Sequence, residues 1–110
     1  MDLTFEWDEE KAKENIRKHK VSFEEAKTVF GDQFSITIPD PHHSIDEYRY
    51  VDIGYSSKGQ LLIAVYLERE PNIRIISCRK ATQWERRVYE EYGFCTTKRG
   101  GLRYASRIRF

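Results

Sequence analysis

The sequence predicts an α+β domain with two N-terminal helices, a four-stranded and mostly antiparallel sheet, a C-terminal helix and a basic tail. Two observations favour this class. Apolar residues recur at helical spacing in residues 8–30 and then alternate with polar residues from residue 34 onward. The predicted strands are joined by short turns, which favours antiparallel neighbours. A chain of 110 residues is long enough for one small domain with its own core.

The first helix is expected to begin after Asp8, which is a good N-cap, and to run to about His19. Ala12, Ile16 and His19 recur at helical spacing, so all three are assigned to its buried face. The basic residues of its last turn suit the negative end of the helix dipole.

A second, short helix is expected directly after the first. Ser22 and Glu25 have the spacing of a capping box, and Gly31 is the expected C-terminal stop. The buried stripe of this helix is assigned to Phe23, Ala26 and Phe30.

Alternation and turn residues predict the sheet. The third strand is almost continuously apolar, which is typical of a strand covered on both faces. A hairpin turn is expected at residues 56–59, and a polar loop at residues 40–47. The four predicted strands span residues 34–38, 48–55, 61–67 and 72–78.

A second capping box is formed by Thr82 and Glu85, and it is expected to open a helix that Gly93 ends. Trp84 and Val88 are one turn apart and are assigned to the core-facing side of this helix. The chain shows no internal repeat and no linker that would divide it.

Charge is divided unevenly, although the formal net charge is only +1. Residues 1–70 contain nine basic and fifteen acidic residues, whereas residues 71–110 contain ten basic and three acidic residues. A basic half interleaved with aromatic residues is typical of nucleic-acid-binding proteins, but a solvated face with a basic tail would carry the same charge. We assign residues 1–92 to one domain and residues 93–110 to a basic C-terminal extension.

A cytoplasmic location is expected. No apolar run reaches the length of a membrane span, and the acidic N-terminus does not resemble a signal peptide. Cys78 and Cys95 fit free thiols in a reducing compartment. Cys78 lies inside a predicted strand and is therefore expected to be a small buried hydrophobic residue.

The most specific local feature is the junction between the last predicted strand and the capped helix. Arg79 and Lys80 stand at this junction, beside the free N–H groups expected at a helix start, and this combination suits a phosphate. Glu85, Arg86 and Tyr89 are assigned to a side of the helix distinct from its apolar residues. A purely structural role for Glu85 as a cap, and for Arg86 as a partner of an acid on the same helix, remains equally consistent.

Other candidates for chemistry are less specific. Lys18 and His19 could act as acid–base groups because imidazole titrates near neutral pH, but a histidine at a helix end also fits a structural role. The two aspartates and two adjacent histidines of residues 40–46 permit a metal-site interpretation, although adjacent histidines seldom form a tetrahedral site. The chain carries no established cofactor or metal motif, so neither is expected.

Metal-free RNA cleavage fits this set of residues because the nucleophile is the 2′-hydroxyl group of the substrate itself. The protein has to orient the RNA, accept the 2′-OH proton, stabilise the pentacoordinate phosphate and protonate the leaving 5′-oxygen. Arg, Lys, His, Glu and Tyr side chains can perform these tasks, and the basic half of the chain gathers most of the candidates.

Two long motifs and several single positions also follow an order characteristic of one family. The matching residues are Phe5-Glu6-Trp7-Asp8, Lys11, Asn15, Lys18-His19, Val21-Ser22-Phe23-Glu24-Glu25-Ala26, Asp40-Pro41, Arg49, Gly54-Tyr55-Ser56 and the run from Arg74 to Glu90. Over residues 3–91, the chain therefore resembles the BrnT toxins.

The resemblance implies a type II toxin with a RelE-like fold, which acts as a ribonuclease and inhibits translation. It also implies a BrnA antitoxin with a ribbon-helix-helix domain, which masks the toxin and represses the shared operon. Operator DNA would then be contacted only through the antitoxin, and no membrane would be involved. Carried over by motif position, the catalytic candidates are His19, Arg79, Lys80, Glu85 and Arg86, and the RNA-binding candidates are Lys18, Arg49, Arg74 and Tyr89.

Within this set, Arg79 and Lys80 are expected on the scissile phosphate, with His19 or Glu85 as the proton carrier. One departure concerns Lys20, which stands where the resembled family usually has Gly, so the end of the first helix is expected to be built differently. Two alternatives remain open: a non-catalytic module that binds nucleic acid or protein, and an inactive toxin that still binds its antitoxin.

Overall fold

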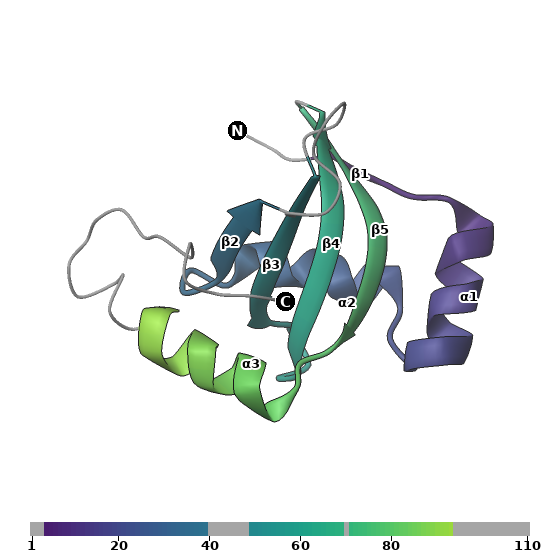
Figure 1. Ribbon diagram of the computed structural model, residues 1–110. Helices are drawn as coiled ribbons and strands as arrows, with labels where there is room; N and C mark the ends of the chain where they lie inside the picture. The colour runs from purple at the N-terminus through teal and green to yellow at the C-terminus, as the bar shows by residue number, and fades with distance from the viewer. Residues whose placement is uncertain (1–3, 40–48, 70, 94–110) are drawn as a thin grey trace.

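The computed structural model describes residues 4–39, 49–69 and 71–93. The chain forms a sheet with helices on both faces (Figure 1). A 3₁₀ turn over Thr28–Gly31 extends α2, and a π-helical segment over Tyr89–Gly93 extends α3. The elements are β1 Thr4–Glu6, α1 Glu9–His19, α2 Phe23–Lys27, β2 Ile36–Pro39, β3 Arg49–Tyr55, β4 Leu61–Arg69, β5 Asn72–Lys80 and α3 Gln83–Val88.

The sheet has five strands in the order β1-β5-β4-β3-β2, and it is mixed. β2 to β5 are antiparallel neighbours, as predicted, whereas β1 pairs with β5 in parallel. The prediction of four strands was wrong because it missed β1. This strand has only three residues, too few to show alternation, and its partner strand lies far along the chain.

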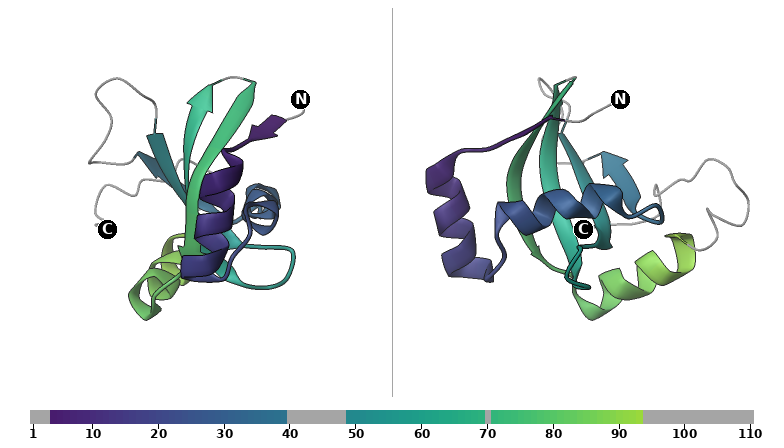
Figure 2. Two further views of the ribbon diagram at one scale, coloured as in Figure 1. Left: turned by 90° about the vertical axis from the view of Figure 1, so that its right-hand side faces the viewer. Right: turned by 180° about the vertical axis from the view of Figure 1, so that it is seen from behind.

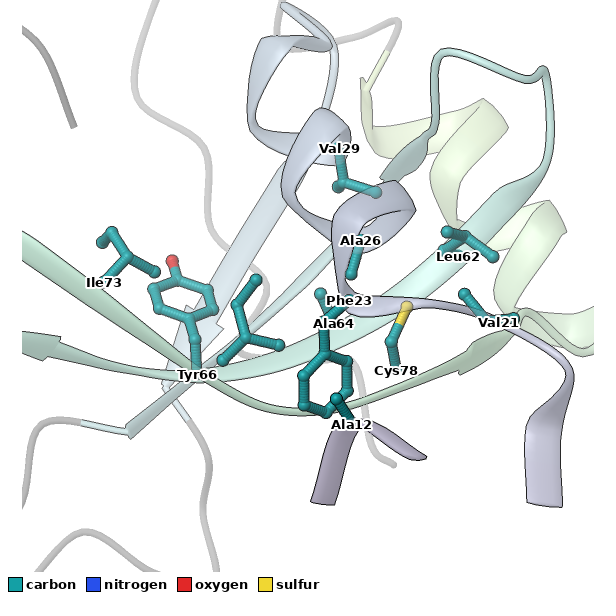
Figure 3. Close-up of a cluster of buried hydrophobic side chains, with 11 residues drawn as sticks. Ala12, Val21, Phe23, Ala26, Val29, Leu62, Ala64, Tyr66, Ile73 and Cys78 are labelled. Atoms are coloured by element: carbon teal, nitrogen blue, oxygen red, sulfur yellow. The ribbon is translucent and has the colours of Figure 1, made fainter. Parts of the chain in front are cut away.

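One face of the sheet is covered by α2, and α1 stands beside it against β5 and contributes to the same core (Figure 2). Phe23 and Ala26 of α2 pack here against side chains of β4 and β5, and Figure 3 shows how these side chains converge. The buried residues of this core are Ala12, Val21, Phe23, Ala26, Val29, Leu62, Ala64, Tyr66, Ile73, Ile75 and Cys78.

The opposite face is covered in part by α3, which lies across the end of the sheet where β3 ends and β4 begins (Figure 1). Val88 of α3 is buried here, as the sequence predicted. The capping box of α3 is also confirmed, with Thr82 and Glu85 each bonding the other's backbone N–H. The buried residues of this second core are Ile36, Ile38, Val51, Ile53, Leu61, Ile63, Val88 and Tyr89.

The buried face of α1 differs from the predicted one. Asp8 caps the helix as expected, but the buried residues are Ala12 and Asn15, whereas Ile16 is 47% exposed and His19 is exposed. The assignment of Ile16 and His19 to the core was therefore wrong. The spacing of residues alone allowed two rotations of this helix about its axis, with either Ile16 or Asn15 facing the core. The hydrogen bonds of the Asn15 amide stabilise the observed rotation.

Asn15 joins α1 to the outer edge of β5. Its Nδ2 donates to the carbonyl oxygens of Val21 at 2.9 Å and Cys78 at 2.8 Å, and its Oδ1 accepts from the Cys78 N–H at 3.1 Å. β1 covers this edge only as far as Arg74, so the amide takes the place of a neighbouring strand at Cys78.

The end of α1 is formed by Lys20, which adopts a left-handed conformation with φ of 63°. Its backbone N–H donates to the carbonyl oxygen of Ile16 and closes the last turn. A lysine here holds the left-handed conformation that Gly adopts at lower energetic cost.

The capping box predicted for α2 is only half formed. Ser22 Oγ accepts from the Glu25 N–H, but the Glu25 carboxylate turns inward instead of returning to Ser22. Its Oε2 accepts from Ser56 Oγ at 2.6 Å and from Gln60 Nε2 at 2.7 Å. This buried carboxylate thereby fixes the β3–β4 hairpin turn, in which Gly59 has a φ of 79°.

Cys78 is buried with 1% of its surface exposed, which confirms its assignment to the core. Burial, together with the nearby Glu25 charge, raises the pKa of its thiol to about 12. The thiol is therefore protonated at neutral pH.

Within the ranges described, no helix has the length and apolar character needed to cross a membrane.

Candidate active site

Arg49, Arg74 and Arg79 project from the face of the sheet that α3 covers only in part. The register pairs Leu67 of β4 with Arg49 on one side and with Arg74 on the other. These two arginines are therefore two strand spacings apart, about 10 Å between backbones. Arg79 pairs with Ile63, whose side chain belongs to the same face.

A bulge in β5 places Arg74 and Arg79 on one face. The two residues are an odd number of positions apart, so strict alternation would direct them to opposite faces. The register shifts between Val65, which pairs with Ser77, and Tyr66, which pairs with Ile75. Ile76 is thus the extra residue, and it restores the common direction of the two arginines.

Arg79 and Glu85 form the central ion pair of this region. Arg79 Nη1 donates to Glu85 Oε1 at 2.9 Å, and Nη2 donates to Oε2 at 2.8 Å. Glu85 Oε1 also accepts from the Thr82 N–H at 2.8 Å. The Glu85 side chain is 5% exposed and that of Arg79 is 38% exposed, so the carboxylate is held from inside the fold while the guanidinium reaches the surface.

The surroundings of Glu85 determine its charge. Burial raises the pKa of this carboxyl, but the hydrogen bonds from Arg79 and Thr82, together with the positive charge of Arg79, outweigh burial and lower the pKa below its ordinary value. Glu85 is therefore ionised at neutral pH. Its carboxylate lies at the start of α3, where the sequence had suggested a phosphate.

The lowered pKa predicts a pH-dependent effect of Glu85→Gln. The contribution of Glu85 to stability is complete above its unfolded pKa of about 4.3 and is lost as the pH falls through the lower folded value. We expect the variant to be less stable than the parent by about 2 kcal/mol at pH 7, with a much smaller difference at pH 2. Urea unfolding followed by circular dichroism at both pH values measures this. A difference that does not change with pH would contradict it.

Lys80 does not join Arg79. It follows Arg79 directly in β5, so its side chain projects from the other face, and its cross-strand partner is Leu62 of the α1–α2 core. The structure therefore gives no support to the expectation that both cations contact one phosphate: the two residues are neighbours in the sequence, but the pleat of the strand directs them to opposite faces.

Lys18 and His19 are exposed at the end of α1, the helix that packs on the face of the sheet opposite to α3. Lys18 Nζ lies 3.9 Å from Glu14 Oε2, within its own helix. The structure thus brings Glu85 to Arg79 but does not bring these two candidates there.

Tyr89 and Arg86 belong to a separate cluster around Asp32, which the sequence analysis did not single out. Tyr89 is buried, and its hydroxyl donates to Asp32 Oδ2 at 2.6 Å. Burial and this hydrogen bond raise the pKa of Tyr89. Arg86 Nη1 donates to the Tyr55 hydroxyl at 3.1 Å, and the Tyr55 ring packs edge-on against Tyr89.

The Asp32 cluster fixes α3 to the sheet. Asp32 also accepts from the Tyr55 N–H at 2.8 Å and from the Phe34 N–H at 2.9 Å, which delays the start of β2 to Ile36. A Cβ at Gly54 would lie 3.2 Å from Asp32 Oδ2 and would crowd the cluster. The only hint in the sequence was Asp32 following a helix-ending Gly.

The residues described contain no group of three or more His, Cys, Asp or Glu side chains that could hold a metal ion. The loop of residues 40–46, which permitted a metal-site interpretation, lies outside the described residues. Of the basic extension assigned to residues 93–110, all residues after Gly93, including Cys95, lie outside them as well.

Together, the fold and this site define a small α+β protein whose mixed sheet presents arginines on a partly open face, beside a buried carboxylate. A family model described as the ribonuclease toxin BrnT of type II toxin–antitoxin systems matches residues 7–85. The chain therefore belongs to the BrnT family of ribonuclease toxins, which confirms the resemblance seen in the sequence. Membership of a type II toxin–antitoxin family implies an antitoxin partner.

The fold is also similar to a solved structure, the crystal structure of the Brucella abortus ribonuclease toxin BrnT. The TM-score is 0.59 at 21% sequence identity, and the match covers 74% of this chain and all of that chain (100%). This likeness confirms the α+β class. A search of curated protein sequences finds no match.

Proposed function

We propose that this chain is a metal-independent endoribonuclease toxin that cleaves RNA by attack of the substrate's 2′-hydroxyl and thereby inhibits translation. The observation that carries the proposal is the shared face of Arg49, Arg74 and Arg79, with the ionised Glu85 beside Arg79. Family membership supports the class of reaction, and the arrangement of these residues supports the site.

Arg79 is the phosphate-binding residue in this proposal. In the reaction the 2′-oxygen forms a bond to phosphorus, the bond to the 5′-oxygen breaks, and negative charge gathers on the non-bridging oxygens. A guanidinium at the surface suits that charge. Arg49 and Arg74, farther along the same face, bind neighbouring parts of the RNA backbone.

Glu85 both positions Arg79 and is the proton carrier that we favour over His19. Its two bonds to Arg79 fix the direction of the guanidinium, and its ionised carboxylate can accept the proton of the 2′-OH and return it to the leaving 5′-oxygen. His19 projects from the helix layer on the other side of the sheet. Lys80 and Lys18 are then peripheral, and Tyr89 and Arg86 act by holding α3 in place.

We further propose that the antitoxin is BrnA-like, with a ribbon-helix-helix domain, and that operator DNA is contacted only through it. An antitoxin of this kind would inhibit the toxin by covering the arginine face. The proposal is supported by membership of a type II toxin–antitoxin family.

Cleavage of an RNA oligonucleotide by the purified protein in EDTA tests the proposed reaction. We expect products that end in a 2′,3′-cyclic phosphate, and no cleavage at a site where a single 2′-deoxy nucleotide removes the nucleophile. Cleavage that needs added Mg²⁺ would overturn metal independence. If the protein binds the RNA oligonucleotide and its 2′-deoxy-substituted version in a salt-dependent way but cleaves neither, a non-catalytic binding module would be supported instead.

A further inference from the structure

Trp84 is exposed, although its spacing from Val88 had assigned it to the core. Its exposed fraction is 44%, whereas Glu85, Val88 and Tyr89 are buried. These buried residues define the side of α3 that faces the sheet. Since successive residues are turned by about 100° around the helix axis, Trp84 lies about 90° from the centre of that side. The core assignment of Trp84 was therefore wrong, because the buried Glu85 and its ion pair rotate the helix away from the apolar phase.

The flank of α3 that carries Trp84 differs from the flank that carries Arg86. Residues two positions apart in an α-helix are separated by about 200° around the helix axis, so Arg86 and Trp84 lie on opposite sides of α3. Arg86 is directed to Tyr55. Trp84 directly precedes Glu85, which holds Arg79, and it shares its flank with the exposed Arg87 one turn later.

We propose that Trp84 is the platform on which an unpaired base of the RNA substrate stacks, next to the phosphate bound by Arg79. The inference rests on the proposed function and adds a specificity-determining residue to the same site. Single-stranded RNA is recognised by combining cations that follow the backbone with aromatic rings on which bases stack. Trp84 lies on α3 between Arg87 and Glu85, the partner of Arg79, so this part of the helix offers both an aromatic ring and cations.

The charge around Trp84 favours RNA over a protein as the occupant. The cations that the geometry assigns to this side of α3 are Arg87 and Arg79, and the acid between them, Glu85, is already paired with Arg79. The side chains that share this part of α3 with Trp84 therefore carry a net positive charge. An indole ring beside fixed cations matches the stacked bases and phosphates of a nucleic acid.

A binding experiment with a single-stranded, fully 2′-O-methylated oligonucleotide of mixed sequence tests the proposal, because this probe cannot be cleaved by 2′-OH attack. The parent, Trp84→Ala and Trp84→Phe are compared. Ile16→Ala is the matched control, since Ile16 has a similar exposed fraction of 47% on the opposite layer. We expect binding to weaken roughly 10-fold or more in Trp84→Ala, to be largely retained in Trp84→Phe, and to be unchanged in Ile16→Ala.

Tryptophan fluorescence gives an independent readout, since the chain has only two tryptophans and Trp7 packs against Phe23. Quenching on binding should occur in the parent and disappear in Trp84→Phe. Equal affinity of the parent and Trp84→Ala would overturn the proposal and leave a protein partner as the occupant of this flank. Failure of the proposed function is a separate result, because it appears as absence of RNA cleavage by the parent.

Discussion

Arg79→Ala is expected to lower the rate of RNA cleavage by at least about 100-fold, which is the scale for removing one hydrogen-bond donor from a developing oxyanion. The bidentate pair with Glu85 holds the guanidinium in one direction, so its loss removes both the charge and its orientation. Single-turnover cleavage of an RNA oligonucleotide by the purified variant measures the effect.

The Arg79 variant also leaves Glu85 buried without its partner, so loss of activity has to be separated from loss of stability. The double variant Arg79→Ala, Glu85→Gln removes the unpaired charge, and we expect it to regain stability but not activity. Lys27→Ala on the exposed side of α2 removes an equal charge and should retain the parental rate.

Lys80→Ala provides the sharpest comparison with Arg79→Ala, because the two residues are neighbours in the sequence but project from opposite faces. Its loss of activity should stay within about 10-fold, below the effect of removing an oxyanion donor. Equal losses in both variants would contradict the assignment of the site to the α3 face. Full activity of Arg79→Ala would remove Arg79 from the mechanism.

Asn15→Ala is expected to lower the free energy of unfolding by about 3 kcal/mol, since it leaves buried backbone groups without partners. The amide satisfies the carbonyl oxygens of Val21 and Cys78 and the N–H of Cys78, all in the interior. A loss of this size is a large fraction of the stability of a domain of this length. Urea unfolding at pH 7 measures the change.

Ile16→Ala is the matched control for Asn15→Ala, because it removes an adjacent and larger apolar side chain that is 47% exposed. We expect it to change stability by less than about 0.5 kcal/mol. If hydrophobicity alone determined the core, the Ile16 variant would be the more damaging one. That outcome would contradict the observed phase of α1.

The errors in assigning residues to the buried faces of helices share one cause. Ile16, His19 and Trp84 were assigned to buried faces by apolar spacing, but Asn15 and Glu85 occupy those faces. A polar side chain is stable in the interior when all its hydrogen bonds are satisfied, and the partners of these two lie on other elements. Hydrophobic periodicity contains no signal for such partners.

The candidate site was predictable in part. The sequence identified Arg79 and Glu85 as members of one motif, and the structure joins them through two hydrogen bonds. Asp32 was missed because the partners that make it a link to α3, a backbone N–H of β3 and the Tyr89 side chain, are both distant in sequence. The catalytic roles of these residues remain predictions.

The sequence by itself determined where most elements begin and end, because caps, turns and alternation act within a few residues. Its motifs also indicated the family to which the chain belongs. Only the tertiary structure decided which cations share a face. The bulge at Ile76 aligns Arg74 with Arg79, and the pleat separates Arg79 from Lys80. The physical reason is the two-residue period of a strand: one inserted residue moves every later side chain to the opposite face, and the pairing of distant strands decides whether it is inserted.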